Sequence, residues 1–211
     1  MGITQRIALL RSELGPVRLV VVTKGRTPQE ILEVLETGVM DIGENRLQET
    51  EEKFAQLKDH ALFQKCTKHF IGHMQSNKAA QIAELFDVVQ SVDSLKIAEK
   101  LSAAAQRQRK KLTVFLQVNA TGEAQKHGCR PSDAPKLAAA IPLLPNLHLV
   151  GLMGMGPQGS EEEIRHCFQT LRKLQRELQL PELSMGMSND YKIALQEGAT
   201  MVRIGSALFE L

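Results

Sequence analysis

Residues 17–42, VRLVVVTKGRTPQEILEVLETGVMDI, decide the fold class because they hold a strand, a helix and a second strand with little between them. The apolar, β-branched run at 17–23 lacks strict polar alternation, which is typical of a strand covered on both faces. Thr27 and Pro28 form a helix N-cap followed by proline at the first helical position. Gly38 follows the helix, where a left-handed residue is favoured. This stretch therefore predicts one unit of a parallel α/β sheet.

The same alternation continues to the end of the chain. Segments with apolar residues at helical spacing, such as 164–178, separate the short apolar runs. Ser160 and Glu163 form a capping box before that segment, and Ser132 fits an N-cap before residues 136–141. The predicted strands are residues 17–23, 39–42, 69–71, 88–92, 112–118, 147–153, 183–187 and 201–204.

Eight strands that alternate with helices over this length predict a single TIM-type (β/α)8 barrel spanning residues 1–211. A doubly wound open sheet is the main alternative, because both folds share the βα alternation. The chain is short for a barrel, for which about 200 residues is the lower end of the usual range. The alternation is read directly from the pattern, whereas closure of the barrel is an inference.

The composition excludes disorder and strongly charged partners. Hydrophobic residues make up 43% of the chain, which is enough for a sizeable core. With 26 basic and 24 acidic residues the net charge is +2, so no large field is directed at nucleic acid or at a membrane. The one basic cluster, at 107–111, ends an amphipathic segment, where it complements the negative helix terminus. We therefore expect neither a nucleic-acid partner nor a membrane partner.

The cysteines and the N-terminus indicate the compartment. Cys66, Cys129 and Cys167 are odd in number and are not spaced for a zinc site or a redox pair. Free thiols are typical of a reducing compartment. The N-terminus begins directly with a helical pattern, without a signal-type stretch, and no run approaches the roughly 18 apolar residues that span a bilayer. A cytoplasmic protein is expected.

Lys24 is the most informative polar residue, because function in a (β/α) barrel lies at the carboxyl ends of the strands. It directly follows the run at 20–23, so its stem would begin within the apolar barrel. A lysine amine kept neutral by burial can attack a carbonyl carbon. The alternative is an ordinary lysine that closes a strand and extends into water.

Phosphate recognition is suggested near the other end of the chain. Residues 201–206, MVRIGS, offer a strand, then Gly205 for close backbone approach and the hydroxyl of Ser206. In barrels a phosphate often lies after strands seven and eight, and Ser188 would add a second hydroxyl there. Alternatively, Gly205 provides only a tight turn and Arg203 pairs with an acid. A lysine facing a phosphate site fits a phosphorylated carbonyl compound, either pyridoxal phosphate or a phosphosugar in an aldolase-type site.

At these positions the sequence resembles the YggS/PROSC family of pyridoxal-phosphate-binding proteins, also called PLP homeostasis proteins. The matching blocks run in family order over nearly the whole chain, and the combination of SMGMSND with VRIGSALF is highly specific. The blocks are VVTK (21–24), GENR (43–46), HFIGHMQSNK (69–78), QVN (117–119), KHG (126–128), GLMGM (151–155), LSMGMSND (183–190) and VRIGSALF (202–209).

The resemblance implies a barrel like the N-terminal domain of alanine racemase, with the cofactor pyridoxal 5′-phosphate held as a Schiff base on Lys24. It also implies that Arg203 faces the pyridine nitrogen, where its fixed charge weakens the ring as an electron sink. The further cofactor-binding residues that it implies are Ser188, Gly205 and Ser206 for the phosphate, and Asn45, His73 and Met153 as pocket lining.

Two function classes compete, a PLP carrier without established catalysis and an amino-acid racemase. Racemisation needs an acid or base on each face of the substrate, and in alanine racemase the second one is a tyrosine from a separate domain. The only tyrosine here, Tyr191, is expected to begin a helix, and the chain ends just after strand eight. We therefore expect a monomeric PLP-homeostasis protein that serves apo PLP-dependent enzymes; a phosphosugar lyase using Lys24 is a third reading.

Overall fold

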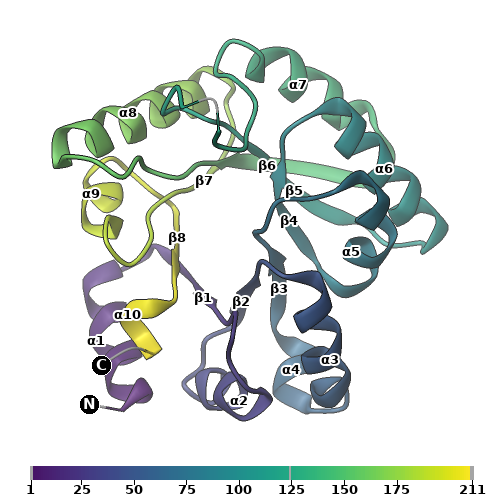
Figure 1. Cartoon of the computed structure of the whole chain (residues 1–211), viewed down its shortest axis with the longest axis vertical. Helices are drawn as coiled ribbons and strands as arrows, with labels where there is room; N and C mark the ends of the chain where they lie inside the picture. Colours follow the sequence, from purple (N-terminus) through teal and green to yellow (C-terminus); the bar gives the residue numbers. More distant parts are fainter. Residues whose placement is uncertain (1, 124, 210–211) are drawn as a thin grey trace.

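The computed structural model describes residues 2–123 and 125–209 and forms a closed barrel of parallel strands in the order β1 to β8, with helices around it (Figure 1). Closure comes from pairing of the first strand with the last, where Arg18 lies opposite Met201 and Val21 opposite Ile204. This pairing confirms the TIM-type barrel and excludes the open sheet. The strands are β1 Arg18–Val22, β2 Asp41–Glu44, β3 Thr67–Phe70, β4 Val88–Val92, β5 Leu112–Gln117, β6 Leu147–Met153, β7 Glu182–Ser184 and β8 Met201–Ile204.

The helices begin and end largely where their caps predict. Thr27 and Glu30 form a reciprocal capping box at the start of α2, and Ser160 and Glu163 do the same for α8. Helices α1 and α10, from the two ends of the chain, contact each other. The helices are α1 Ile3–Leu14, α2 Pro28–Glu36, α3 Leu47–Leu57, α4 Ala61–Lys65, α5 Ala79–Leu85, α6 Leu95–Arg107, α7 Ala134–Ala140, α8 Glu161–Glu177, α9 Tyr191–Gln196 and α10 Ser206–Phe209, with short 3-10 turns η1 Ser76–Lys78 and η2 Ile141–Leu143.

Several predicted boundaries are wrong, among them the end of β2 and the start of β3, and three differences have a local reason. Strand β2 begins at Asp41 because Val39 is buried in the connection from α2, so its apolar character reflects core packing and not strand pairing. Strand β7 ends at Ser184 because Gly186, at φ +96°, turns the backbone out of the extended region. Ser132 is not the cap of α7; the helix begins one residue later, after Asp133, whose carboxylate accepts from Arg130 Nε at 2.9 Å.

Apolar side chains form two layers. The larger one lies between the strands and the helices, whereas a smaller cluster fills the inside of the barrel. In β1, Val20 belongs to the inner cluster and Val21 to the outer layer, as the alternation of side chains along a strand requires. Burying each large apolar side chain contributes about 1.5–3 kcal/mol. The filled interior leaves only the rims of the barrel open to ligands. The inner cluster is Val20, Val88, Phe115, Met153 and Met201.

The three cysteines are free, as predicted, and the structure shows that all three are buried. Burial raises the pKa of the Cys66 and Cys167 thiols to about 11 and that of Cys129 to about 12, so all three are poor nucleophiles near neutral pH. Within residues 2–123 and 125–209, no helix combines the length and apolarity needed to cross a bilayer. The same residues contain no cluster of three histidine, cysteine, aspartate or glutamate side chains placed to hold a metal ion.

Candidate functional site

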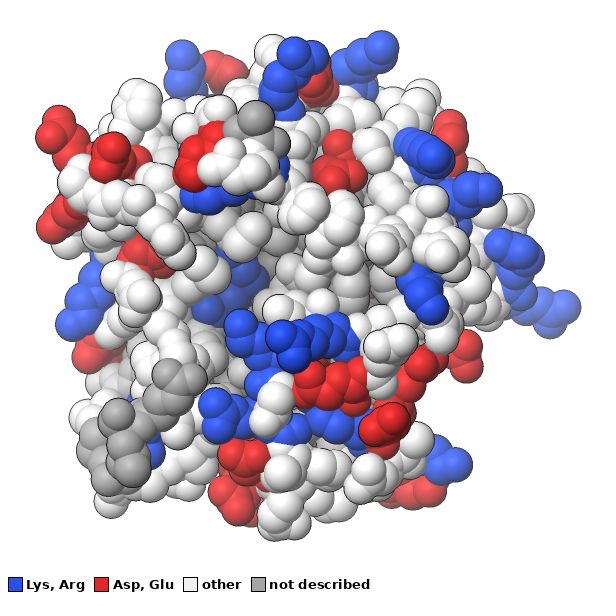
Figure 2. Space-filling view, in the orientation of Figure 1, with Lys and Arg blue, Asp and Glu red and all other residues white. Residues whose placement is uncertain are grey.

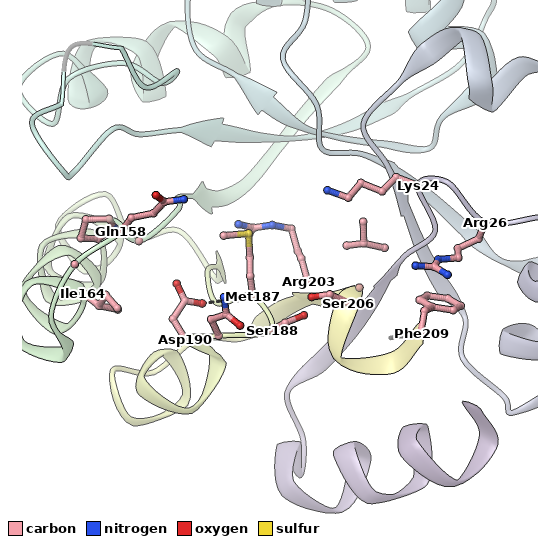
Figure 3. A pocket seen from close by; sticks show the side chains of 16 residues that line it. Lys24, Arg26, Gln158, Ile164, Met187, Ser188, Asp190, Arg203, Ser206 and Phe209 are labelled. Atoms are coloured by element: carbon pink, nitrogen blue, oxygen red, sulfur yellow. Dashed lines mark hydrogen bonds between the residues drawn. The ribbon is translucent and has the colours of Figure 1, made fainter. Parts of the chain in front are cut away.

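A cavity of about 580 Å³ lies where β1, β7 and β8 end. Five of the residues predicted for the site line it: Lys24, Ser188, Arg203, Gly205 and Ser206. Figure 3 shows the Lys24 side chain extending into the cavity from one side, Arg203 opposite its amine, and both serines on the same side of the cavity as α10. Because the carboxyl ends of the strands meet at one rim of the barrel, a lysine, an arginine and two hydroxyls lie around one cavity.

The backbone on both sides of Lys24 is held by side chains of α3. Lys53 Nζ donates to the carbonyl oxygen of Thr23 at 2.9 Å, and the amide of Gly25 donates to Glu49 Oε1 at 2.5 Å. Lys53 is itself held by two carboxylates, Glu44 at 2.6 Å and Glu49 at 3.0 Å. We call Glu44, Glu49 and Lys53 the ionic clamp. It fixes the turn from which the Lys24 side chain extends.

The two carboxylates of the ionic clamp differ in environment. Burial raises the pKa of Glu44, although Lys53 and the Thr23 hydroxyl, which donates to Glu44 Oε1 at 2.7 Å, act against it. Burial alone would also raise the pKa of Glu49, but hydrogen bonds from Lys53 and the Gly25 amide outweigh it and lower that pKa. Buried charges require such partners. Loss of the Lys53 ammonium would leave two carboxylates uncompensated.

Arg203 is held rigidly in the floor of the cavity. Its side chain comes from β8, and only 3% of the residue is exposed. Nη1 donates to Ser184 Oγ at 2.7 Å, and Nη2 donates to the carbonyl oxygen of Gly154 at 2.8 Å. Burial lowers the pKa of Arg203 to about 10, while attraction to the Asp190 carboxylate opposes the shift. The guanidinium therefore remains charged at neutral pH and can only donate hydrogen bonds.

The residues after β7 and β8 form a cradle suited to an anion. Ser188 Oγ accepts from the backbone amide of Ala207 at 3.2 Å, which ties the two loops together. Ser206 begins α10, whose first amides have no carbonyl partner within the helix. A Cβ on Gly205 would lie 3.2 Å from Val22 Cβ, so glycine allows the two strand ends to approach closely. The cradle offers two hydroxyls and backbone amides, which are phosphate ligands in proteins.

Asp190 lines the cavity but was not predicted as a site residue. Its carboxylate accepts from the backbone amide of Met187 at 2.6 Å, and burial raises its pKa. Arg26 and Phe209 also line the cavity, with the guanidinium 4.5 Å from the ring centroid. The available signal for Asp190 was its place in the block 183–190. Phe209 had the same kind of signal, as the last residue of the block 202–209, whereas Arg26 lies outside the quoted blocks.

Asn45 and His73 lie elsewhere at the barrel rim. They line a second cavity of about 560 Å³, and the His73 ring stacks on His127 with centroids 3.7 Å apart. Met153 is fully buried in the inner cluster and does not line the first cavity. Their roles as cofactor contacts therefore stay predictions.

Tyr191 begins α9, as predicted, and lies outside the cavity lining. Its hydroxyl donates to Glu13 Oε2 at 2.7 Å. Burial and this carboxylate raise the pKa of Tyr191 to about 12. Tyr191 is thus engaged with α1 and not with the site.

Acidic and basic side chains are mixed on the face of the molecule drawn in Figure 2. Figure 2 shows acidic and basic residues interspersed on one face, with basic side chains gathered near its middle and acidic ones beside them. The net charge of +2 agrees with this mixture. The visible face presents no continuous basic surface of the kind that binds nucleic acid.

A family model and two relatives from different organisms resemble this chain over most of its length. The family model described as alanine racemase, N-terminal domain, matches residues 2–211. A pyridoxal phosphate homeostasis protein from Pseudomonas aeruginosa is 47% identical over 196 residues, covering 92% of this chain and 84% of that protein. The human pyridoxal phosphate homeostasis protein is 36% identical over 208 residues, covering 91% of this chain and 75% of that protein.

Solved structures extend the likeness to the fold. PipY from Synechococcus elongatus, in a structure with PLP bound, superimposes with a TM-score of 0.88 at 37% identity and covers 98% of this chain and 99% of that chain. Alanine racemase from Clostridium difficile has a TM-score of 0.82 at 14% identity and covers 99% of this chain and 56% of that chain. At that identity the racemase shows the shared fold alone.

Proposed function

This chain belongs to the alanine racemase N-terminal domain family and, within it, to the pyridoxal phosphate homeostasis proteins, and we propose that it binds pyridoxal phosphate covalently at Lys24. The observation that carries the proposal is the convergence of Lys24, Arg203 and the cradle of Ser188 and Ser206 on one cavity. An amine, a fixed cation and a set of phosphate donors match the functional groups of this cofactor.

Each group has a distinct part in binding. Pyridoxal phosphate supplies an aldehyde that condenses with an amine and a ring that can draw electrons from a bound amino group. The Lys24 amine is the nucleophile that would attach the aldehyde. The hydroxyls of Ser188 and Ser206 and the Ser206 amide at the start of α10 would hold the phosphate, while the Ala207 amide ties Ser188 in place. Arg203 would lie at the pyridine ring of the cofactor. Its guanidinium only donates hydrogen bonds and has no site that could take up a proton.

These features favour holding the cofactor over racemisation. Racemisation requires an acid or base on each face of the substrate. Among the described residues that line the cavity, Asp190 has the only carboxylate, and the Met187 amide already donates to it. Tyr191 is bound to Glu13 instead. The absence of a free second base in this lining supports a carrier, as does the fixed charge of Arg203.

We further propose that the protein works in the cytoplasm as a monomer and releases PLP to apo PLP-dependent enzymes. The names of the relatives place those proteins in pyridoxal phosphate homeostasis. The cofactor cavity opens at the rim of the barrel and not deep within it, which suits uptake and release. This part of the proposal rests on the family and on the position of the cavity.

The direct test is binding of pyridoxal phosphate to wild-type protein, Lys24→Ala and Lys192→Ala. We expect a visible absorbance band with wild type and with Lys192→Ala, because Lys192 is exposed and lies outside the cavity. Lys24→Ala should lose the band while its unfolding curve stays close to wild type. Retention of the band in Lys24→Ala would refute the assignment of this lysine.

A further inference from the structure

Arg203 is one end of a hydrogen-bond chain that crosses the inside of the barrel. Arg203 Nη1 donates to Ser184 Oγ at 2.7 Å, and Ser184 Oγ donates to Gln90 Oε1 at 2.6 Å. Gln90 Nε2 lies 2.9 Å from His69 Nδ1, and His69 Nε2 lies 2.9 Å from Asp41 Oδ1. We call these five residues the interior chain. It joins β8, β7, β4, β3 and β2.

The two ends give the interior chain a single direction. An arginine can only donate, and an ionised carboxylate can only accept. Ser184 Oγ must therefore accept a hydrogen bond from Arg203 and donate one to Gln90 Oε1. Reversal of the Gln90 amide would require a second proton on the His69 ring, because His69 would then have to donate from both nitrogens. When the ring carries one proton, Gln90 Nε2 donates to His69 Nδ1, and it also lies 3.2 Å from Met201 Sδ. Arg203 donates to Ser184 in every case, because a guanidinium cannot accept.

The chain is buried and connects the two rims of the barrel. Ser184, Gln90 and His69 are 0% exposed and lie among the apolar side chains of the inner cluster. Polar groups in such surroundings are costly unless every donor and acceptor is used, and satisfied networks of this kind are rigid. Of the five residues only Arg203 lines the cofactor cavity, whereas Asp41 lines a cavity of about 290 Å³ that it shares with Arg18, the first residue of β1.

We infer that the interior chain orients the Arg203 guanidinium toward the bound cofactor, which makes Ser184, Gln90, His69 and Asp41 positioning residues. The inference rests on the proposed function, because it concerns the ring that Arg203 would meet. Ser184 accepts from one terminal nitrogen of the guanidinium and Gly154 from the other, which leaves further N–H groups for the cofactor. Loss of the Ser184 contact would free the guanidinium to rotate about its remaining bond.

The first experiment compares Ser184→Ala with Ser102→Ala. Both remove a buried serine hydroxyl that donates at 2.6 Å, but Ser102 donates to the Pro145 carbonyl oxygen on the outside of the barrel. We expect Ser184→Ala to weaken pyridoxal phosphate binding about tenfold and to shift the visible absorbance maximum, while Ser102→Ala changes neither. If both variants form the adduct with equal affinity and equal spectra, the inference is wrong and the proposed function stands.

A double-mutant cycle tests transmission from the far end. Asp41→Asn keeps the shape of the side chain but weakens its bond to His69, so we expect about threefold weaker cofactor binding. In a Ser184→Ala background the same substitution should have no further effect, because the chain is already cut. Independent effects, which add in binding free energy and so multiply in the dissociation constant, would overturn the inference. Thermal unfolding of each variant checks that all four proteins of the cycle are folded.

A measurement without cofactor tests the direction itself. The nitrogen NMR shifts of the His69 ring should report a neutral imidazole with its proton on Nε2 and a bare Nδ1 that accepts from Gln90. A proton on Nδ1 would overturn the assigned direction. If wild-type protein forms no adduct with pyridoxal phosphate, the proposed function fails and the inference fails with it. Adduct formation with the wrong ring state removes only the inference.

Discussion

The two principal residues of the cavity are supported by networks of opposite character. Behind Lys24, the ionic clamp of Glu44, Glu49 and Lys53 lies between the barrel and α3 and holds the backbone through full charges. Behind Arg203, the interior chain crosses the barrel through side chains that need no charge between its two ends. One network fixes a turn of the backbone, and the other fixes the direction of a side chain.

The difference follows from what each place allows. In the clamp, Glu44 and Lys53 are buried as a direct ion pair, and only Glu49 is partly exposed, so each charge has a partner of opposite sign. The interior chain passes through a packed apolar cluster, where an uncompensated charge would cost far more. In the interior chain the charged residues are therefore the two at its ends, Arg203 and Asp41, which lie at the two rims of the barrel. The clamp should matter most for stability, and the chain most for cofactor geometry.

The largest effect is expected for Lys53→Met. Removing the ammonium leaves Glu44 and Glu49 without their shared partner, and breaking a buried ion pair costs about 3–5 kcal/mol. Chemical denaturation should show this loss in the free energy of unfolding. The control is Lys173→Met, because Lys173 lies 3.9 Å from Glu177 with both side chains exposed. A cost for Lys53→Met no larger than that of the control would mean that the clamp carries little stability.

A smaller effect is expected for Gln90→Met. This substitution nearly keeps the side-chain volume but removes the hydrogen bonds of Gln90 with Ser184, His69 and the Met201 sulfur, and it leaves Ser184 and His69 with unused groups. Each unsatisfied buried group costs about 1–3 kcal/mol, partly offset because methionine packs well among apolar neighbours. The free energy of unfolding should therefore fall less than in Lys53→Met. The reverse order would contradict the comparison between the two networks.

The smallest effect is a difference in acid sensitivity. Hydrogen bonds from Lys53 and Gly25 hold the folded pKa of Glu49 below its unfolded value. The stability from this carboxylate is therefore present above the unfolded pKa of about 4.3 and is lost as pH falls through the lower folded pKa. Glu49→Gln should show a shallower loss of stability over that range than wild type, measured by denaturation at a series of pH values. Parallel curves would show that the clamp does not use this charge.

Much of the fold follows from local patterns. Caps such as Thr27 and Ser160 and the apolar runs predicted the strand and helix order, because local backbone preferences determine both. The alternation of strands and helices does not by itself determine closure of the barrel, because an open sheet shows the same alternation. The pairing of Arg18 with Met201 depends on residues far apart in sequence, and no local signal encodes it.

The site was predicted only in part, for a related reason. The strand-end rule identifies the rim of a barrel but not which part of the rim a residue occupies, so the sequence places His73 in the lining of the Lys24 pocket although the two residues line different cavities. Of the interior chain only Arg203 was predicted, because the other members are ordinary strand residues without a sequence signal. Ser184 and Gln90 are 94 positions apart and meet only when the barrel closes.

The most direct test of the central claim is to locate the covalent bond. Wild-type protein would be incubated with pyridoxal phosphate, reduced with borohydride and digested, and the peptide masses would be measured by mass spectrometry. We expect the visible band to disappear on reduction and a phosphopyridoxyl group to be found on the peptide that carries Lys24. A label on another lysine, or no label with excess cofactor, would contradict the claim that this barrel holds pyridoxal phosphate at the end of β1.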